Sequence, residues 1–317
     1  MLNTQLSPWP CFSEQEVEAV SAVLRSNKVN YWTGQESRLF EKEFAKYTDS
    51  KYAIALANGT LALDLALYAL GIGQGDEVIV TSRTFIASIS SIINAGAIPV
   101  FADVELDSQN ISAATIAPVI SDKTKAIICV HLAGWPCEMD DIMALAHIHS
   151  LYVIEDCAQA HGAKYKGRSV GSIGHVGAWS FCQDKIMTTG GEGGMLTTND
   201  EQLWRKAWAF KDHGKSYAAV YEKDHPPGFR WLHESFGTNW RLTEMQSAIG
   251  RIQLTRMAEW TEKRNDNARR IYQSANEFSF CKIPQWPNNI QHAHYKCYVQ
   301  IETELLINGW TRDKIEN

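Results

Sequence analysis

The residues most able to do chemistry in this sequence are one lysine and one aspartate, 29 positions apart. Lys185 follows an apolar run and precedes the segment 190–194, which holds four glycines and lets a backbone pass close to a ligand. Asp156 ends another apolar run. An enzyme that uses pyridoxal phosphate (PLP) needs both groups: an amine that forms a Schiff base with the aldehyde, and a carboxylate that keeps the pyridine ring protonated.

Each of these two residues also has an ordinary interpretation. A single lysine is usually a solvated surface amine, and Asp156 could cap a helix or form a structural salt bridge. A carboxylate at the end of an apolar strand is nevertheless costly unless it is paired. A pyridinium N–H⁺ would pair with it and keep it ionised.

Five further residues could hold the same cofactor. Gly59 and Thr60 stand between a predicted strand and a predicted helix, where free N–H groups and the helix dipole favour a phosphate, although an ordinary N-cap turn has the same pattern. Phe85 follows the next strand and could stack on a planar ring, or could be a core phenylalanine. Ser180 could reach the phosphate, and Gln159 could hydrogen-bond the phenolic oxygen.

Other cofactor chemistries find less support. The glycines at 190–194 are not followed by Gly-Lys-Ser/Thr, and those at 71–75 follow a helix instead of a strand, so neither is a nucleotide-binding fingerprint. An NAD(P)-dependent oxidoreductase is therefore disfavoured. His131, His161 and His213 lack metal-ligand spacing, and no Gly-x-Ser-x-Gly element supports a serine nucleophile.

Composition sets the class of protein. The chain has 317 residues, is 45% hydrophobic and carries a net charge of −6, which suits a large core and disfavours a nucleic-acid partner. No run of about 18 apolar residues predicts a membrane span. The N-terminus does not resemble a secretion signal, and the seven cysteines are scattered without a Cys-x-x-Cys pair. We therefore expect a cytoplasmic protein with reduced thiols.

The order of predicted elements indicates an α/β fold. From residue 52 short apolar strands alternate with helices up to about residue 155, as in a mostly parallel sheet covered on both faces. Helices are predicted at 111–120, at 242–263 and, after a break, at 265–277, and a strand at 295–302. We expect a large domain over residues 1–240, N-terminal helices included. Residues 241–317 should hold a linking long helix and the start of a smaller C-terminal α+β domain that appears incomplete.

The sequence resembles the DegT/DnrJ/EryC1/StrS family of PLP-dependent sugar aminotransferases, which have the aspartate aminotransferase-like fold (fold type I). The motifs that carry the resemblance occur in the family's order and spacing. They are residues 58–60, 84–87, 155–163, Ser180 with Lys185, 191–194 and 237–241.

This resemblance implies roles for the candidate residues. Lys185 would carry the cofactor and shuttle protons, Asp156 would hold the pyridine nitrogen, and Asn239 would reach the phosphate of a neighbouring subunit. The expected assembly is thus a homodimer with shared active sites. Transamination is favoured, because Lys185 is not replaced by the histidine of the family's dehydratases. L-glutamate would be the amino donor.

The sugar is harder to assign from sequence. Trp135 and Cys137 depart from the family pattern, and we expect the 8-aldehyde of a Kdo-like acid sugar, aminated to 8-amino-3,8-dideoxy-D-manno-octulosonate for lipopolysaccharide biosynthesis. A nucleotide-linked keto sugar is the alternative substrate, and a non-catalytic PLP-fold regulator the alternative function. The residues predicted from loop position to contact the substrate are Tyr31, Trp32, Trp135, Gln183 and Arg230; an arginine could bind a carboxylate bidentately.

Overall fold

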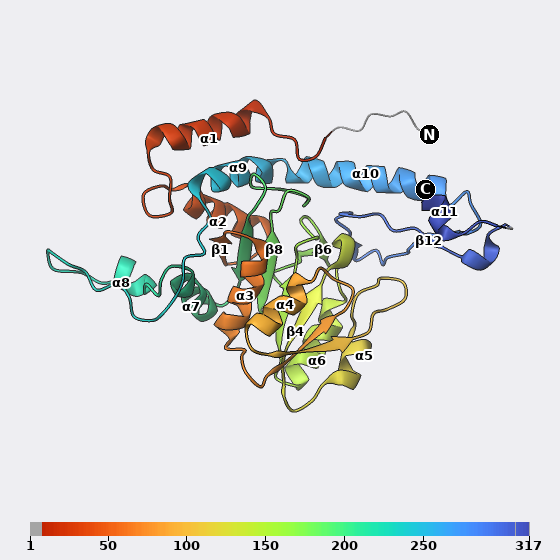
Figure 1. Cartoon of the computed structure of the whole chain (residues 1–317), viewed down its shortest axis with the longest axis horizontal. Coiled ribbons are helices and arrows are strands. Elements are labelled where there is room, and N and C mark those ends of the chain that lie inside the picture. The colour runs from red at the N-terminus through yellow and green to blue at the C-terminus, as the bar shows by residue number, and fades with distance from the viewer. Residues whose placement is uncertain (1–7, 308, 317) are drawn as a thin grey trace.

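The fold was obtained as a computed structural model, which describes residues 8–307 and 309–316 (Figure 1). Residues 1–7, on which the expectation about a secretion signal mostly rests, lie outside the described residues. Within the described ranges, every helix is too short or too polar to cross a bilayer.

A seven-stranded sheet forms the centre, in the order β1-β9-β8-β5-β4-β2-β3. Only β9 opposes the strands beside it, and the other neighbouring pairs in this sheet are parallel. The predicted fold class is confirmed. The strands are β1 (Tyr52–Leu56), β2 (Glu77–Thr81), β3 (Ile98–Ala102), β4 (Thr124–Val130), β5 (Tyr152–Asp156), β8 (Val176–Ser180) and β9 (Gly194–Thr198).

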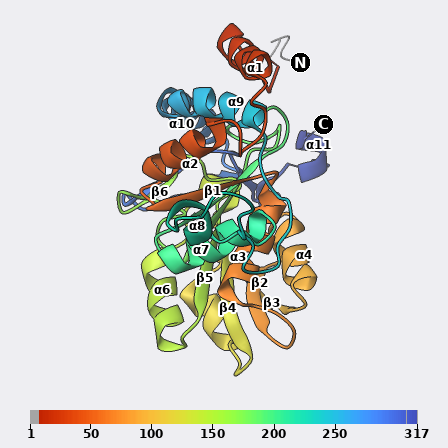
Figure 2. The ribbon, with the colours of Figure 1, turned by 90° about the vertical axis from the view of Figure 1, so that its left-hand side faces the viewer.

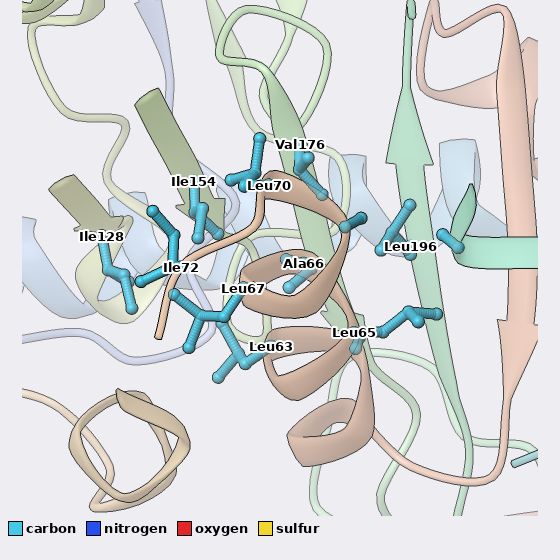
Figure 3. Close-up of a cluster of buried hydrophobic side chains, with 14 of the residues drawn as sticks. Leu63, Leu65, Ala66, Leu67, Leu70, Ile72, Ile128, Ile154, Val176 and Leu196 are labelled. Atoms are coloured by element: carbon cyan, nitrogen blue, oxygen red, sulfur yellow. The ribbon is translucent and has the colours of Figure 1, made fainter. Parts of the chain in front are cut away.

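Helices cover both faces of this sheet, as Figure 2 shows with α6 on one side and α4 on the other. The first face packs on α3 (Gly59–Leu70), α4 (Ala87–Asn94) and α7 (Glu201–Lys211). Leucines of α3, and Ile72 just after it, meet Ile128, Ile154 and Leu196 of the strands there (Figure 3). The second face packs on α2 (Glu36–Tyr47), α5 (Ala113–Ile116), α6 (Met139–Ile148) and α9 (Glu244–Thr255).

Strand alternation sorts the side chains of β5 between these two cores. Ile154 packs in the core on the α3 side, and Val153 packs in the core on the α6 side. Successive side chains of a strand point to opposite faces. Asp156 therefore faces the α3 side and its neighbour Glu155 the α6 side.

The remaining elements lie at the periphery. The long pair α9 and α10 (Met257–Ala275) crosses one end of the molecule, with α1 (Glu14–Ser26) beside α9 (Figure 1). A three-stranded sheet joins β6 (Lys164–Tyr165), β7 (Arg168–Ser169) and β11 (Ile290–Gln291), and a two-stranded one joins β10 (Cys281–Lys282) and β12 (Gln300–Ile301). Two further short helices are α8 (Tyr217–Tyr221) and α11 (Arg312–Glu316), and 3-10 turns span Leu132–Gly134 and Thr303–Leu305.

Three predicted elements differ from the structure. The helix expected at 111–120 is α5 followed by a 3-10 turn at Ala117–Val119, because Pro118 cannot continue an α-helix. The strand expected at 295–302 shrinks to the two residues of β12. The break in the long helix falls at Arg256, not near 264; the Arg256 side chain binds Glu16 of α1 at 2.8 Å, a contact that local sequence does not reveal.

The boundary expected at residues 240 and 241 stays a prediction. Residues from beyond it join the earlier part of the chain, since Ile290 of β11 pairs with Tyr165 of β6. Met257 and Ala293 also pack in the core around Phe44 and Trp179. The C-terminal segment therefore lies against the sheet that carries Asp156.

Glu155, the neighbour of Asp156 on β5, is fully buried and takes part in four hydrogen bonds. Its oxygens accept the N–H groups of Gly171 (2.8 Å), Ile173 (2.8 Å) and Gly174 (2.6 Å), and contact Nε2 of His131 at 2.9 Å. Burial alone would raise the pKa of Glu155, but the His131 and amide hydrogen bonds hold it below its usual 4.5.

We expect Glu155→Gln to destabilise the fold by about 3 kcal/mol or more, because the new amide nitrogen faces backbone N–H donors in a buried place. Since the folded pKa of Glu155 is depressed, its contribution is complete above about pH 4.5 and is lost as the pH falls further; the variant should lose that part of the acid dependence. Urea unfolding against pH measures both effects. Glu18→Gln, which alters an exposed ion pair, is the control and should change stability by about 1 kcal/mol or less; equal stability of both variants would contradict the role of Glu155.

Candidate active site

One cavity of about 570 Å³ collects most of the candidate cofactor residues. It lies where β5 and β8 end and α3 begins, the edge of an open α/β sheet at which ligands bind. Its lining includes Gly59, Thr60, Phe85, Asp156, Gln159, Ser180 and Lys185. Lys185 and Asp156 thus line the same cavity.

Asp156 is buried at the C-terminal end of β5, and each of its carboxylate oxygens accepts a hydrogen bond. The hydroxyl of Ser88 donates to Oδ2 at 2.7 Å, and the N–H of Ala158 donates to Oδ1 at 3.1 Å. Ser88 is itself fully buried and contacts the hydroxyl of Thr84 at 2.8 Å. Burial raises the pKa of Asp156, and the Ser88 and Ala158 hydrogen bonds offset only part of that rise. A cationic ring nitrogen would supply the missing stabilisation of the carboxylate.

Lys185 sits on a turn after β8 that the neighbouring strand holds in place. Its N–H donates to the carbonyl of Cys182, and the loop closes where Phe181 pairs with Gly193 and Thr189. The glycines were expected to let the backbone approach a ligand. The structure shows a different use: a Cβ on Gly194 would lie 2.2 Å from the Asn58 carbonyl oxygen. Close packing between β9 and the start of α3 is what requires glycine here.

The amine of Lys185 has two polar neighbours. Nζ lies 3.2 Å from Oδ2 of Asp184 and 3.5 Å from the hydroxyl of Tyr295, which in turn donates to Asp184 at 2.7 Å. Tyr295 comes from the C-terminal segment, where its N–H binds the carbonyl of Ala133 at 2.9 Å. Sequence reasoning missed Tyr295 because nothing local links it to a lysine 110 positions away.

The start of α3 has the features of a phosphate seat. The Asn58 side chain caps the helix by accepting the Leu61 N–H at 2.9 Å. The N–H groups of Gly59 and Thr60 form no hydrogen bond to any described residue, so they remain available to an anion. A Cβ on Gly59 would lie 2.6 Å from the Cβ of Ser180, which shows how closely the helix start approaches the end of β8.

The middle of the cavity suits a planar ring. Phe85 projects there with 67% of its surface exposed, so it is not the core residue that was the alternative. Gln159 accepts the N–H of Ala133 through Oε1 at 2.7 Å, and its amide nitrogen has no hydrogen-bond partner among the described residues, so it can donate to a ligand oxygen. Donors, ring and carboxylate together fit the phosphate, pyridine and phenolic oxygen of PLP.

His131, Glu155 and Cys157 form a buried group behind Asp156 whose potential ligand atoms lie within 4.8 Å of one another. Sequence spacing had not indicated it. Nδ1 of His131 accepts the Cys137 N–H at 3.0 Å, so the ring proton is on Nε2, directed to Glu155. Since both oxygens of Glu155 are also occupied by amides, we describe the group as a structural hydrogen-bond network that fixes the end of β5.

The structure does not bring the predicted substrate residues to this cavity. Tyr31 is 3% exposed in the core, where it hydrogen-bonds Trp208 and Glu41. Trp32 packs edge-on against Trp208. Trp135 is buried against Trp286 and His292. The sequence placed these aromatic residues on loops. In the structure Tyr31 and Trp32 pack in the core, and Trp135 lines a neighbouring cavity.

Three predicted residues are exposed to solvent, namely Gln183, Arg230 and Asn239. Gln183 lies on the Lys185 turn but does not line the cavity. Arg230 belongs to the segment after α8, which extends away from the sheet in Figure 1. Asn239 forms an isolated bridge with Asp212. Their predicted roles, including the contact of Asn239 with a second subunit, stay predictions.

We expect Ser88→Ala to weaken PLP binding roughly tenfold, because Asp156 would lose a hydrogen bond made to its charged form. Absorbance titration of the cofactor-free protein with PLP measures the affinity. Ser90→Ala on the same helix is the matched control, since its hydroxyl donates only to backbone carbonyls of α4 and the residue before it. Equal affinities of the two variants would show that Ser88 does not act on Asp156.

Comparisons with known proteins agree with this geometry. Residues 10–316 match the model of the DegT/DnrJ/EryC1/StrS aminotransferase family. The crystal structure of an aminotransferase from Psychrobacter cryohalolentis superimposes with a TM-score of 0.96 and 66% identity, covering 98% of this chain and 81% of that one.

Two curated relatives are named for their sugars. GDP-perosamine synthase of Escherichia coli O157:H7 is 38% identical over 294 residues, 93% of this chain and 77% of that protein. dTDP-3-amino-3,4,6-trideoxy-alpha-D-glucose transaminase of Streptomyces venezuelae is 38% identical over 247 residues, 78% of this chain and 62% of that protein. The chain belongs to the DegT/DnrJ/EryC1/StrS family and is a PLP-dependent aminotransferase.

Proposed function

We propose that the chain transfers the amino group of L-glutamate to the carbonyl of a nucleotide-linked keto sugar. The observation that supports amino transfer most directly is that Lys185 and Asp156 line the same cavity. The nucleotide-linked sugar is supported by two relatives whose names contain GDP and dTDP sugars.

The Kdo-like aldehyde becomes the second choice of substrate. The unusual segment around Trp135 had supported it, but the Trp135 side chain does not line the cofactor cavity and packs against Trp286 and His292. Arg230, expected to bind the acid group, is on an exposed segment. Within one protomer, the positions of Trp135 and Arg230 therefore give no reason to prefer an acid sugar as the substrate.

The cofactor roles follow from the lining of the cavity. Asp156 would hold the pyridine nitrogen and Phe85 would stack on the ring, with Gln159 donating to the phenolic oxygen. Gly59, Thr60 and Ser180 would hold the phosphate. Asn239 of a second subunit would complete this phosphate site in a homodimer, and its exposure leaves it available for that contact.

The protein's own groups would manage the proton. PLP, when bound, supplies an aldehyde that takes up the amino group and a ring that stabilises negative charge at the reacting carbon. Lys185 would carry the cofactor and then move the proton between carbon centres as a general base and acid. The Tyr295 hydroxyl donates a hydrogen bond to Asp184 and so presents an oxygen lone pair to the amine of Lys185, which would orient Nζ whenever it is free.

We expect the PLP-loaded protein to show the absorbance band of the lysine-bound cofactor, and Lys185→Ala to abolish both the band and turnover. Lys166→Ala, which removes an exposed amine paired with Asp140, should leave both unchanged. Absorbance spectra and a coupled 2-oxoglutarate assay provide the measurements. An unaltered band in Lys185→Ala would overturn the assignment of this lysine.

Glutamate should convert the loaded enzyme to its amino form, and a nucleotide-linked keto sugar should restore the original spectrum. A panel of UDP-, GDP- and dTDP-linked keto sugars, with the 8-aldehyde of a Kdo-like acid as the competing substrate, measures the preference. Restoration by the acid aldehyde alone would reverse our choice of substrate. Absence of any change with glutamate would favour a non-catalytic regulator.

A further inference from the structure

The structure has a second, smaller cavity of about 160 Å³, and some of its lining residues neighbour those of the cofactor cavity along the chain. Arg83 lines it from the loop after β2, Ala133 and Trp135 from the loop after β4, and Lys296 with Tyr298 from the C-terminal segment. Pockets that enclose a whole small molecule start at roughly 300 Å³. The second cavity is therefore large enough for one chemical group of a ligand, not for a whole nucleotide sugar.

The chain connects the two cavities at three points. Arg83 stands two positions before Phe85, which lines the first cavity. Ala133 lines the second cavity and donates its N–H to Gln159 in the first. Lys296 follows Tyr295, which contacts the amine of Lys185. A substrate at Lys185 could thus place one of its groups between Arg83 and Lys296.

Both cations of the second cavity lack a carboxylate partner among the described residues. Arg83 lies over the ring of Tyr298 at 5.3 Å, and Lys296 lies 5.8 Å from the ring of Tyr295. The one acid in the lining, Asp107, pairs with Lys282 at 3.2 Å. Aromatic stacking fixes a guanidinium without neutralising it, so the cavity keeps a positive charge that can bind an oxyanion.

We propose that Arg83 and Lys296 bind the anionic group of a substrate whose reacting atom lies at Lys185. The chemistry is that of a phosphate or a carboxylate held by a planar guanidinium and an ammonium. A nucleotide-linked sugar supplies phosphate, and glutamate supplies its side-chain carboxylate. The site takes the role that sequence had assigned to Arg230, and it rests on the proposed function.

The test uses the PLP-loaded enzyme and the variants Arg83→Met, Lys296→Met and their combination. Arg270→Met is the matched control, because Arg270 is an exposed guanidinium of α10 that lines neither cavity. Calorimetry measures the binding of inorganic pyrophosphate. Stopped-flow absorbance measures the half-reaction with L-glutamate, and the glutamate concentration that gives half its maximal rate.

If the site binds phosphate, Arg83→Met and Lys296→Met each weaken pyrophosphate binding roughly tenfold or more, with no change in the glutamate half-reaction. If it binds the donor, the half-saturating glutamate concentration rises by a similar factor and pyrophosphate binding is unaffected. Arg83→Lys should recover part of either loss. A double variant that matches the control in both measurements overturns the proposal.

The two proposals can fail separately. A wild-type enzyme without any glutamate half-reaction would refute the proposed function, while its pyrophosphate affinity would still report on Arg83 and Lys296. Loss of the fold is excluded as a cause when the variants keep the PLP absorbance band, since this band depends on Lys185 and not on the second cavity.

Discussion

Two adjacent carboxylates buried at the end of β5 impose the main constraint on this molecule. The pleat of the strand sends Glu155 to one face and Asp156 to the other. Glu155 accepts hydrogen bonds from three backbone amides and contacts His131. These protein groups alone stabilise its ionised form. Asp156 has two donors and a raised pKa. Glu155 therefore stabilises the fold, whereas the carboxylate of Asp156 can still bind a cationic ligand.

The surroundings of Asp156 depend on close backbone approaches. The start of α3 meets the end of β8 at Gly59 and Ser180, and β9 meets the Asn58 carbonyl at Gly194, distances that leave no room for a Cβ. These contacts bring an uncapped pair of helix N–H groups to the same cavity as the carboxylate.

The C-terminal segment completes the site from outside the central sheet. Residues 293–296 hydrogen-bond the loop at 133–134, and that loop is bonded to Gln159. Tyr295 is thereby held against Lys185, and Lys296 is held at the second cavity. The strand ends thus supply most of the candidate cofactor residues, and the segment that folds back supplies part of the lining of the second cavity.

The sequence alone determined the α/β class and the positions of the candidate cofactor residues at strand ends, Lys185 and Asp156 among them, whose roles stay predictions. These depend on local periodicity and on the rule that parallel strands present their carboxyl ends along one edge. Tertiary structure decided what local patterns do not encode. It placed Ser88 on Asp156 and Tyr295 on Lys185, and it buried Trp135, because each of these contacts joins segments that are distant along the chain and meet only when the cores close.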